Sequence, residues 1–238
     1  MRLVKCGRDG QWKEMQMAEP DPSPPKAPRP RYRVTPVLLV LGGLCCVIEL
    51  VLMAADAGLI GTPLWRGQAY QNGAFWAGLL YNWRPNYAAQ PWLMFITYAF
   101  LHSDFWHLAG NMLTLFFLGN IVQDRVGQGG LAWIYTVSAI GGAAAFGLLT
   151  SSPQPMVGAS GALFGLAGAC LYWEWCDRRR EGRSRWPVWR IVFALVVLNA
   201  LLWAVKGGVL AWETHLGGFV AGWIGAVLLA RMGRGGPA

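Results

Sequence analysis

The amino-acid sequence predicts an all-α membrane protein, a bundle of six transmembrane helices, and three observations indicate this fold class. Of its 238 residues, 55% are hydrophobic and 13% are charged, whereas soluble domains carry about 25% charged residues. The apolar residues gather in long uncharged runs, as membrane spans require. The net charge of +8 is concentrated, with eight of the 20 Lys and Arg residues before position 34 and six between positions 178 and 190. This clustering is typical of membrane-protein loops, so no nucleic-acid partner is expected.

The polar residues 1–35 predict a disordered, basic and proline-rich cytoplasmic tail. Six prolines between positions 20 and 30 disfavour regular structure there. The tail also lacks the apolar stretch of a signal peptide. The six-helix domain is expected over residues 36–232, followed by a short C-terminal tail at 233–238.

Six apolar runs are predicted to span the bilayer, although several are shorter than the ~20 residues of a full span. They cover approximately residues 37–55, 107–122, 131–149, 158–175, 187–205 and 215–230. Glu49 lies inside the first run, where a charge is costly, so it is expected to face the bundle interior or a polar cavity. Residues 56–101 are rich in Trp and Tyr interleaved with Gly, Pro and Asn. This composition predicts a folded first loop that is partly embedded in one leaflet.

The distribution of Lys and Arg predicts the orientation of the spans. Basic residues precede the first run and follow the fourth and the sixth, whereas residues 151–156 carry no charge. The positive-inside rule places both termini in the cytoplasm of an integral, multi-pass protein, expected in a bacterial inner (plasma) membrane. The second, fourth and sixth spans then begin at the outer face. His107, Asn111, Ser160 and His215, which begin these spans, therefore share one leaflet.

Ser160 is the candidate nucleophile. A lone serine among small residues is more often a helix-packing residue. Here, however, Gly161, Gly165 and Gly168 follow it on one helical face, and such a face lets another helix approach very closely. Ser160 also begins its helix, where backbone N–H groups point toward a developing anion.

His215 is the candidate general base. A single buried histidine often donates only to a backbone carbonyl, but Gly218 and Gly222 make the face of His215 equally smooth. Two smooth faces, one with serine and one with histidine, suit a hydroxyl–imidazole contact between helices. No aspartate is placed to orient His215, and Glu213 and Asp104 are candidates only by elimination. A dyad is therefore favoured over a triad.

His107 and Asn111, four positions apart, project from one face of a helix. As neutral donors they suit an oxyanion hole, with helix–helix hydrogen bonding as the alternative. The pattern lacks a third metal ligand, and the five cysteines include no C-x-x-C pair, so no metal and no cofactor are expected. His102 is interpreted as structural, and Ser103 and Asp104 as helix-capping residues.

Residues 119–127, with glycine at both ends and a polar centre, are predicted to form a tight turn after the second span. Together with three further motifs, this segment resembles the rhomboid family of intramembrane serine proteases. The further motifs are His102-x4-His107-x3-Asn111, Gly158-Ala159-Ser160-Gly161 and His215-x2-Gly218-x3-Gly222. In this order and on these spans the motifs are highly specific, and the resemblance covers about residues 90–230.

The resemblance implies a Ser160–His215 catalytic dyad and an oxyanion hole formed by His107, Asn111 and the Ser160 N–H. It also implies cleavage of single-span membrane proteins in or near the lipid bilayer, with lateral entry of the substrate. Phe164 falls where the family often has an aromatic residue that stacks on the catalytic histidine. The supporting residues are Gly158, Phe164, Gly218 and Gly222.

Two places depart from the family pattern. Leu93 and Met94 stand where the first loop usually has Trp-Arg, and Trp83-Arg84 lies earlier and is not an obvious substitute. Gln123 stands where the turn commonly has Glu. Both departures bear on loop packing and stability, and neither removes a catalytic group.

The sequence thus predicts an intramembrane serine endopeptidase that cleaves transmembrane segments of membrane-protein substrates with a Ser–His dyad. The alternative is a catalytically silent protein of the same fold that binds transmembrane segments, although such a protein needs neither Ser160 nor His215. A transporter is disfavoured because the sequence has no evident internal repeat and Glu49 is the only charge well inside a span. The natural substrate, the oligomeric state and the role of the tail stay open.

Overall fold

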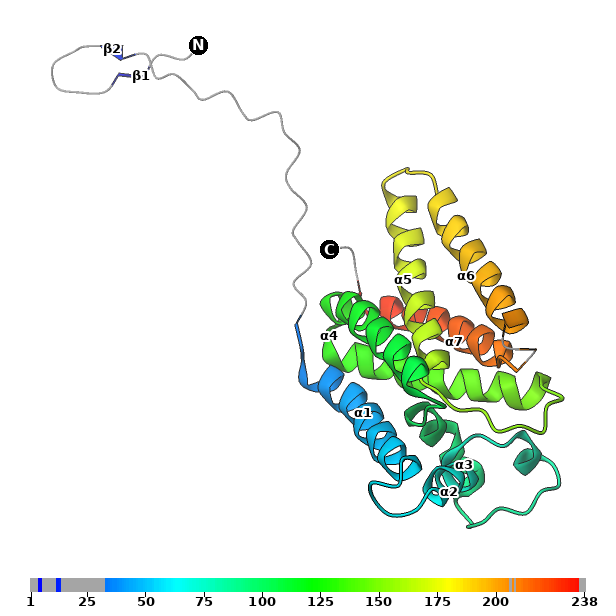
Figure 1. The fold of residues 1–238 in the computed structure, drawn as a ribbon. Coiled ribbons are helices and arrows are strands. Elements are labelled where there is room, and N and C mark those ends of the chain that lie inside the picture. Colours follow the sequence, from blue (N-terminus) through cyan, green and yellow to red (C-terminus); the bar gives the residue numbers. More distant parts are fainter. Residues whose placement is uncertain (1–3, 6–11, 14–32, 206, 208, 236–238) are drawn as a thin grey trace. The chain divides into compact units, whose positions relative to one another are not determined.

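The computed structural model describes residues 4–5, 12–13, 33–205, 207 and 209–235, and their regular structure is almost entirely helical (Figure 1). The chain divides into two compact units, Met1–Pro30 and Arg31–Ala238. In the first unit, two short strands, β1 (Val4–Lys5) and β2 (Trp12–Lys13), pair antiparallel. Most of the predicted disordered tail lies outside the described residues.

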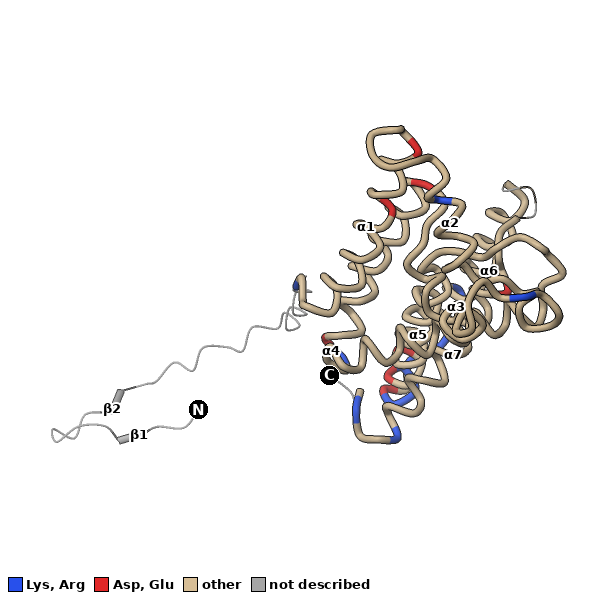
Figure 2. The backbone as a smooth tube through the Cα atoms, turned by 90° about the horizontal axis from the view of Figure 1, so that it is seen from below, with Lys and Arg blue, Asp and Glu red and all other residues tan. Residues whose placement is uncertain are grey.

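Four helices of the second unit are long and apolar enough to cross a bilayer. They are α1 (Pro36–Asp56), α4 (Phe105–Leu149), α6 (Trp186–Val205) and α7 (Trp212–Arg231). A fifth long helix, α5 (Ser160–Arg180), is less apolar because its last turn holds three consecutive arginines. Figure 2 shows charged residues mainly in loops and near helix ends, with long uncharged stretches between them. The all-α class predicted from composition is confirmed.

Helix α4 consists of two helices that join at Gly127. This residue has φ 72° and ψ 174°, a backbone conformation that glycine adopts without steric cost. The predicted turn over residues 119–127 is therefore wrong in its extent, because the first helix continues up to Gly127. Its polar centre is satisfied by the chain that enters α1, where the Thr35 hydroxyl donates to Gln123 Oε1 at 2.7 Å. Because Gln123 binds this other segment, its hydrogen bonds do not require a turn over residues 119–127.

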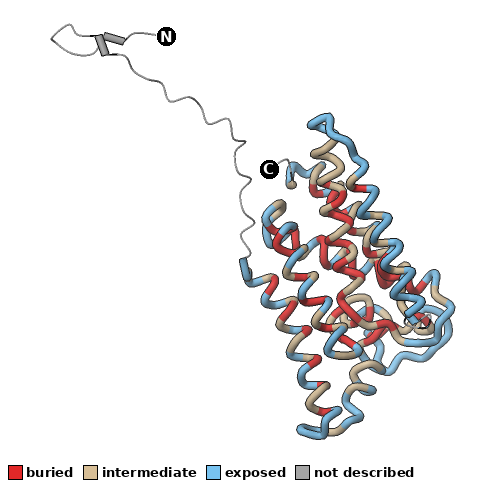
Figure 3. Tube along the Cα trace, turned by 45° about the horizontal axis from the view of Figure 1, so that its top comes forward, coloured by how far each residue is buried: buried red, intermediate tan, exposed pale blue. Residues whose placement is uncertain are grey.

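Buried residues concentrate along the inner helices α4, α5 and α7 (Figure 3). The predicted close approach of two glycine faces is confirmed between α5 and α7. A Cβ atom added at Gly218 would overlap the carbonyl oxygen of Gly161, and one added at Gly222 would overlap that of Gly165. The main chains of α5 and α7 are thus in direct contact, and backbone atoms fix the separation of the two helices.

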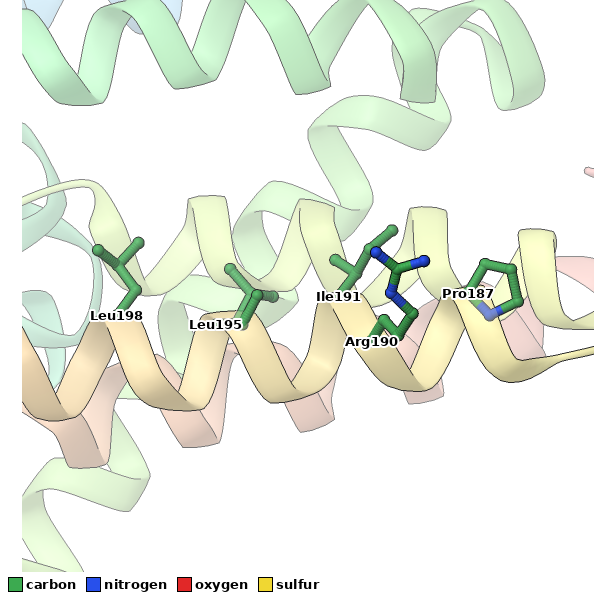
Figure 4. A pocket seen from close by; sticks show the side chains of 6 residues that line it. Pro187, Arg190, Ile191, Leu195 and Leu198 are labelled. Carbon is green, nitrogen blue, oxygen red and sulfur yellow. The ribbon is translucent and has the colours of Figure 1, made fainter.

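Helix α6 is the least packed of the long helices. Val188 is its only buried residue among those described, and most of its large apolar side chains are exposed. A cleft of about 420 Å³ runs along one side of α6, and Figure 4 shows the lining side chains on that side. The lining residues are Pro187, Arg190, Ile191, Ala194, Leu195 and Leu198. None of them is a predicted site residue.

The first loop is folded. It contains the helices α2 (Leu64–Gly73), η1 (Ala77–Leu80), α3 (Gln90–Thr97) and η2 (Tyr98–Phe100). Phe75 and Met156 exchange two backbone hydrogen bonds of 3.0 and 2.9 Å, and the Gly158 N–H donates to the Tyr98 carbonyl at 3.0 Å. These bonds tie the first loop to the residues that lead into Ser160.

Glu49 faces the interior of the helical unit, as predicted. Its side chain has no exposed surface and pairs with Arg66 of α2. The Arg66 guanidinium also donates to Asp56 and to the carbonyl of His102. One arginine therefore joins α1, the first loop and the segment that leads into α4.

Candidate active site

Ser160 and His215 are in contact, each near the start of its helix. Ser160 is the first residue of α5, and His215 lies in the first turn of α7. The Oγ atom of Ser160 lies 2.9 Å from Nε2 of His215. His215 is buried, whereas Ser160 is partly exposed. A serine hydroxyl hydrogen-bonded to an imidazole is the pairing that activates a serine nucleophile.

The glycine contact between α5 and α7 holds this pair together. Gly161 follows Ser160 directly, and Gly218 comes three positions after His215. Since the backbones of Gly161 and Gly218 touch, the two helices are as close at the site as main chains allow. A larger residue at either glycine would separate the hydroxyl from the imidazole.

The ring of Phe164 stacks on the imidazole of His215. The ring centroids are 4.2 Å apart and the planes differ by 10°. Phe164 lies one helical turn after Ser160, on the same helix. The stack covers one face of the imidazole and restricts its rotation, so it orients His215 toward the serine.

His107 and Asn111 lie beside the segment that leads into Ser160. A Cβ atom added at Gly158 would stand 2.6 Å from Cε1 and 2.7 Å from Nε2 of His107, and 3.6 Å from Nδ2 of Asn111. Gly158 also has φ 121°, a conformation that residues with a side chain rarely adopt. Glycine at this position therefore leaves room for two polar side chains next to the serine.

Asn111 offers a hydrogen-bond donor at this place. Its Nδ2 atom is buried and has no hydrogen-bond partner within the described part of the chain. A buried donor without a partner is unfavourable for stability. Asn111 lies four positions after His107 on α4, a spacing that turns both side chains to one face. Chemically, the pair can bind a negatively charged oxygen beside Ser160.

Asp104 caps α4, as predicted. Its Oδ1 accepts a hydrogen bond from the His107 N–H at 2.9 Å, and the Ser103 hydroxyl donates to its Oδ2 at 2.7 Å. The backbone hydrogen bond from His107 is the main cause that holds the pKa of Asp104 below its usual value. The Oγ of Ser103 also lies 3.1 Å from Nδ1 of His107. The cap thus fixes the ring of His107 with Nε2 toward Gly158.

His102 is fully buried beside His107, with ring centroids 5.2 Å apart. Its carbonyl accepts hydrogen bonds from the Tyr70 hydroxyl at 2.7 Å and from Arg66 Nη1 at 3.0 Å. Its ring nitrogens have no hydrogen-bond partner among the described residues, and burial lowers the pKa of His102 to about 4. His102 is therefore neutral at neutral pH and packs against His107.

The structure brings to His215 a residue that the sequence reading missed, Asn199 of α6. Its Oδ1 lies 2.6 Å from Nδ1 of His215. Asp104 instead caps α4, and Glu213 lies two residues before His215 on α7, a spacing that turns the two side chains apart. The available signal was a neutral polar residue in the apolar run 187–205, since such residues usually have a partner inside a membrane protein.

The described residues include no group of three or more His, Cys, Asp and Glu side chains that could hold a metal ion. Their cysteines, Cys45, Cys46, Cys170 and Cys176, are free thiols in α1 and α5. Buried or half-buried cysteines of this kind behave as small apolar side chains.

Comparison with known proteins gives a family model and several relatives. The model of the Rhomboid domain matches residues 89–232, which is more than half of the chain. Rhomboid protease GluP of Bacillus subtilis (strain 168) is 32% identical over 143 residues, which cover 60% of this chain and 27% of GluP. RHOMBOID-like protein 1 of Arabidopsis thaliana is 34% identical over 148 residues, which cover 60% of this chain and 36% of that protein.

A further relative is Rhomboid protease GlpG of Klebsiella pneumoniae. It is 29% identical over 148 residues, which cover 60% of this chain and 50% of GlpG. The chain thus spans between about a quarter and half of the length of these relatives. The matched domain contains every residue of the candidate site. Its apolar helices make this an integral membrane protein, and the chain belongs to the rhomboid family.

Proposed function

We propose that this protein is an intramembrane serine endopeptidase that hydrolyses peptide bonds in transmembrane segments of other membrane proteins. The observation that carries the proposal is the 2.9 Å approach of Ser160 Oγ to Nε2 of His215. The relatives GluP and GlpG are both named rhomboid proteases, which supports a hydrolytic use of this pair. A protein that only bound transmembrane segments would not require a hydroxyl and an imidazole in this geometry.

In the proposed reaction, Oγ of Ser160 attacks the carbonyl carbon of the scissile bond while Nε2 of His215 takes the hydroxyl proton. The tetrahedral intermediate collapses, the C–N bond breaks, and His215 delivers its proton to the leaving amine. A water molecule then attacks the acyl-enzyme ester and gives a proton to His215. When that proton returns to Ser160, the carboxylic acid product is released.

His107, Asn111 and the Ser160 N–H are the proposed oxyanion hole. The Nδ2 atom of Asn111 has no hydrogen-bond partner among the described residues, so it can donate to the oxyanion without first breaking another bond. The Ser160 N–H begins α5, and the first amides of a helix have no intrahelical acceptor. The removal of one such donor typically lowers kcat by about 10²- to 10³-fold.

The proposed topology has six spans: α1, the two halves of α4, α5, α6 and α7. The arginines at the end of α5 and those at and after the end of α7 support cytoplasmic termini, and the proposed location is a bacterial inner membrane. Ser160 and His215 lie at the N-terminal ends of α5 and α7, whereas the arginines lie at the C-terminal ends. The proposed site is therefore close to the outer face, where water can enter. In this topology residues 1–35 are a cytoplasmic tail, 36–232 the protease domain and 233–238 a short C-terminal tail.

The proposed substrates are single-span membrane proteins. A helical transmembrane segment keeps its carbonyl groups hydrogen-bonded and inside the helix. The serine can reach a carbonyl only where the segment is extended. We therefore expect substrates with Gly or Pro near the cleavage position, because these residues weaken a helix locally.

The test is hydrolysis of a fluorogenic transmembrane peptide that carries such a Gly–Pro segment. Wild-type protein purified in detergent is compared with Ser160→Ala and His215→Ala, and with Ser152→Ala as the matched control in an exposed loop. The proposal expects activity and fluorophosphonate labelling in the wild type and in Ser152→Ala. It expects neither in Ser160→Ala, and no hydrolysis in His215→Ala.

Thermal unfolding of each variant shows whether a loss of activity reflects a loss of fold. If wild type and Ser160→Ala hydrolyse a panel of such peptides equally slowly, the catalytic assignment is wrong. Binding of the same peptides by the inactive protein would then favour a silent rhomboid-like protein that binds transmembrane segments.

A further inference from the structure

We infer that Asn199 is a positioning residue for His215, so that the site is a Ser160–His215–Asn199 triad whose third member comes from α6. The inference rests on the proposed function, since it concerns how the general base of that reaction is held. It goes beyond the dyad expected from the sequence, because it adds a group that selects one tautomer of His215.

The hydrogen bonds of Asn199 determine which atom of its amide faces the histidine. Its Nδ2 donates to the carbonyl oxygen of Leu195, one turn earlier in α6, at 3.1 Å. Its Oδ1 is the atom that lies 2.6 Å from Nδ1 of His215. An amide oxygen can only accept a hydrogen bond. Nδ1 of His215 therefore carries a hydrogen and donates it to Asn199.

This tautomer leaves the lone pair of neutral His215 on Nε2. Because Nε2 lies 2.9 Å from Oγ of Ser160, the serine hydroxyl donates to it, which is the direction that proton transfer requires. The other tautomer would place a hydrogen on Nε2, and His215 could not take the serine proton. Asn199 thus holds His215 as a base, and its carbonyl dipole also stabilises the imidazolium that forms.

The place of Asn199 in α6 argues against a role in packing alone. The helix is otherwise apolar except for Arg190 and its tryptophans, and a polar side chain in a membrane helix is costly unless it is hydrogen-bonded. Both ends of the Asn199 amide are bonded. Val188, the only residue of α6 that is buried in the described structure, lies eleven positions earlier. The amide therefore sits where apolar packing contributes little to holding the helix.

An amide also suits this location better than a carboxylate. An ionised carboxylate is far more costly inside a bilayer than a neutral side chain. Asparagine supplies the acceptor that orients the imidazole without a buried negative charge. The charged third member of soluble serine proteases is thus replaced by a neutral group that performs the same orientation.

The test compares Asn199→Leu and Asn199→Asp with Val196→Ala, a control at an exposed position of the same helix. Hydrolysis of the fluorogenic transmembrane peptide is measured from acidic to weakly alkaline pH. Asn199→Leu is expected to lower kcat by about 10- to 100-fold with little change in KM. Asn199→Asp is expected to keep most of the activity and to move the acid limb of the profile to higher pH, because a carboxylate favours the protonated imidazole. Val196→Ala should match the wild type.

The other groups around His215 are the same in all these variants. His107 of α4 interacts with it electrostatically. Ser160 and Phe164 contact it from α5, and Glu213 precedes it on α7. A shift of the acid limb between Asn199→Asp and the wild type therefore reports the group at position 199. A purely structural role would lower thermal stability and leave the acid limb in place.

A second measurement does not depend on any variant. The chain has three histidines, so magnetic resonance of isotope-labelled histidine can assign the tautomer of His215 in the wild-type protein. A hydrogen on Nδ1 is expected. A hydrogen on Nε2, or an Asn199→Leu variant with the kcat and pH profile of the wild type, would overturn the inference. If instead Ser160→Ala is as active as the wild type, the proposed function itself is wrong.

Discussion

The Glu49 carboxylate in α1 accepts two hydrogen bonds from the guanidinium of Arg66 in α2, each 3.0 Å long. Glu49 has no exposed surface, and the Arg66 side chain is only 19% exposed. Removal of one partner of a buried pair leaves the other charge without compensation, which is much more costly than the net contribution of the pair itself. The pair also holds the carbonyl of His102 through Arg66, and His102 lies beside His107.

Glu49→Ala is therefore expected to lower the free energy of unfolding by about 3 kcal/mol. The matched control is Glu181→Ala, which removes an exposed carboxylate that pairs with Arg183, and a change within about 0.5 kcal/mol is expected there. Equilibrium unfolding in a mild detergent measures both. Equal stability of the two variants would show that the buried pair does not hold the first loop.

Gly218→Ala is expected to disrupt the packing of α5 against α7. The added methyl group would overlap the carbonyl oxygen of Gly161, and neither backbone can yield without moving a helix, so we expect a loss of about 3 kcal/mol or more in stability. Gly43→Ala in α1 is the control, because no atom lies within 4 Å of the position of its new Cβ. That control should be neutral or slightly stabilising, by up to about 1 kcal/mol. Similar melting temperatures for both variants would contradict the direct main-chain contact.

Asn111→Ala is expected to separate activity from stability. The proposed role predicts a fall in kcat of about 10²- to 10³-fold. The Nδ2 atom of Asn111 has no partner among the described residues, so its removal breaks no hydrogen bond made by that atom and should leave thermal stability unchanged or slightly higher. Kinetics on the transmembrane peptide test the expected fall in kcat, and thermal unfolding tests the expected stability. A fall in stability with no change in kcat would assign Asn111 to helix packing.

The stability of the protein is expected to fall in acid through His102. Burial holds its pKa at about 4, below the usual value of 6.5. As the pH falls, His102 therefore takes up its proton in the unfolded chain before it does so in the folded protein. The stability that comes from burying neutral His102 is complete above pH 6.5 and is lost as the pH falls from 6.5 toward 4. The separation of the two pKa values corresponds to roughly 3 kcal/mol.

In His102→Asn this part of the pH dependence should disappear. The free energy of unfolding is measured for both proteins over that pH range, and the difference between the two curves isolates His102 from the other titrating groups. If the two curves run parallel, His102 does not titrate on unfolding.

The long apolar runs and the glycine spacings predict much of this structure, because residues on the buried face of a helix recur every three to four positions in the sequence. The start of α5 at Ser160 and the contact of its glycine face with that of α7 follow from such local patterns. The inward position of Glu49 follows from a different rule, because an uncompensated charge is costly inside a bilayer. Its partner, Arg66, lies in an irregular loop whose path no local pattern specifies.

The contact of Asn199 with His215 is likewise not specified by a local sequence pattern. Periodicity indicates which face of a helix is apolar, but α6 is apolar on nearly all sides, so its sequence does not reveal which face meets His215. The turn predicted over residues 119–127 is wrong in its extent for a related reason. The polar residues before Gly127 bind the chain near Thr35, about 90 positions earlier in the sequence, and a local sequence pattern does not reveal so distant a partner.

The main-chain contact between α5 and α7 has a consequence for how the protein responds to the thickness of its membrane. Helices adjust their tilt when the hydrocarbon layer is thinner or thicker than their apolar length. Gly161 and Gly218 leave no side chain between the two backbones that could compress or change rotamer, so α5 and α7 tilt as one rigid body. The close main-chain contacts at these glycines do not include α6, so we expect α6 to tilt separately. We therefore expect bilayer thickness to alter the distance from Asn199 to His215 and to leave the distance from Ser160 to His215 unchanged.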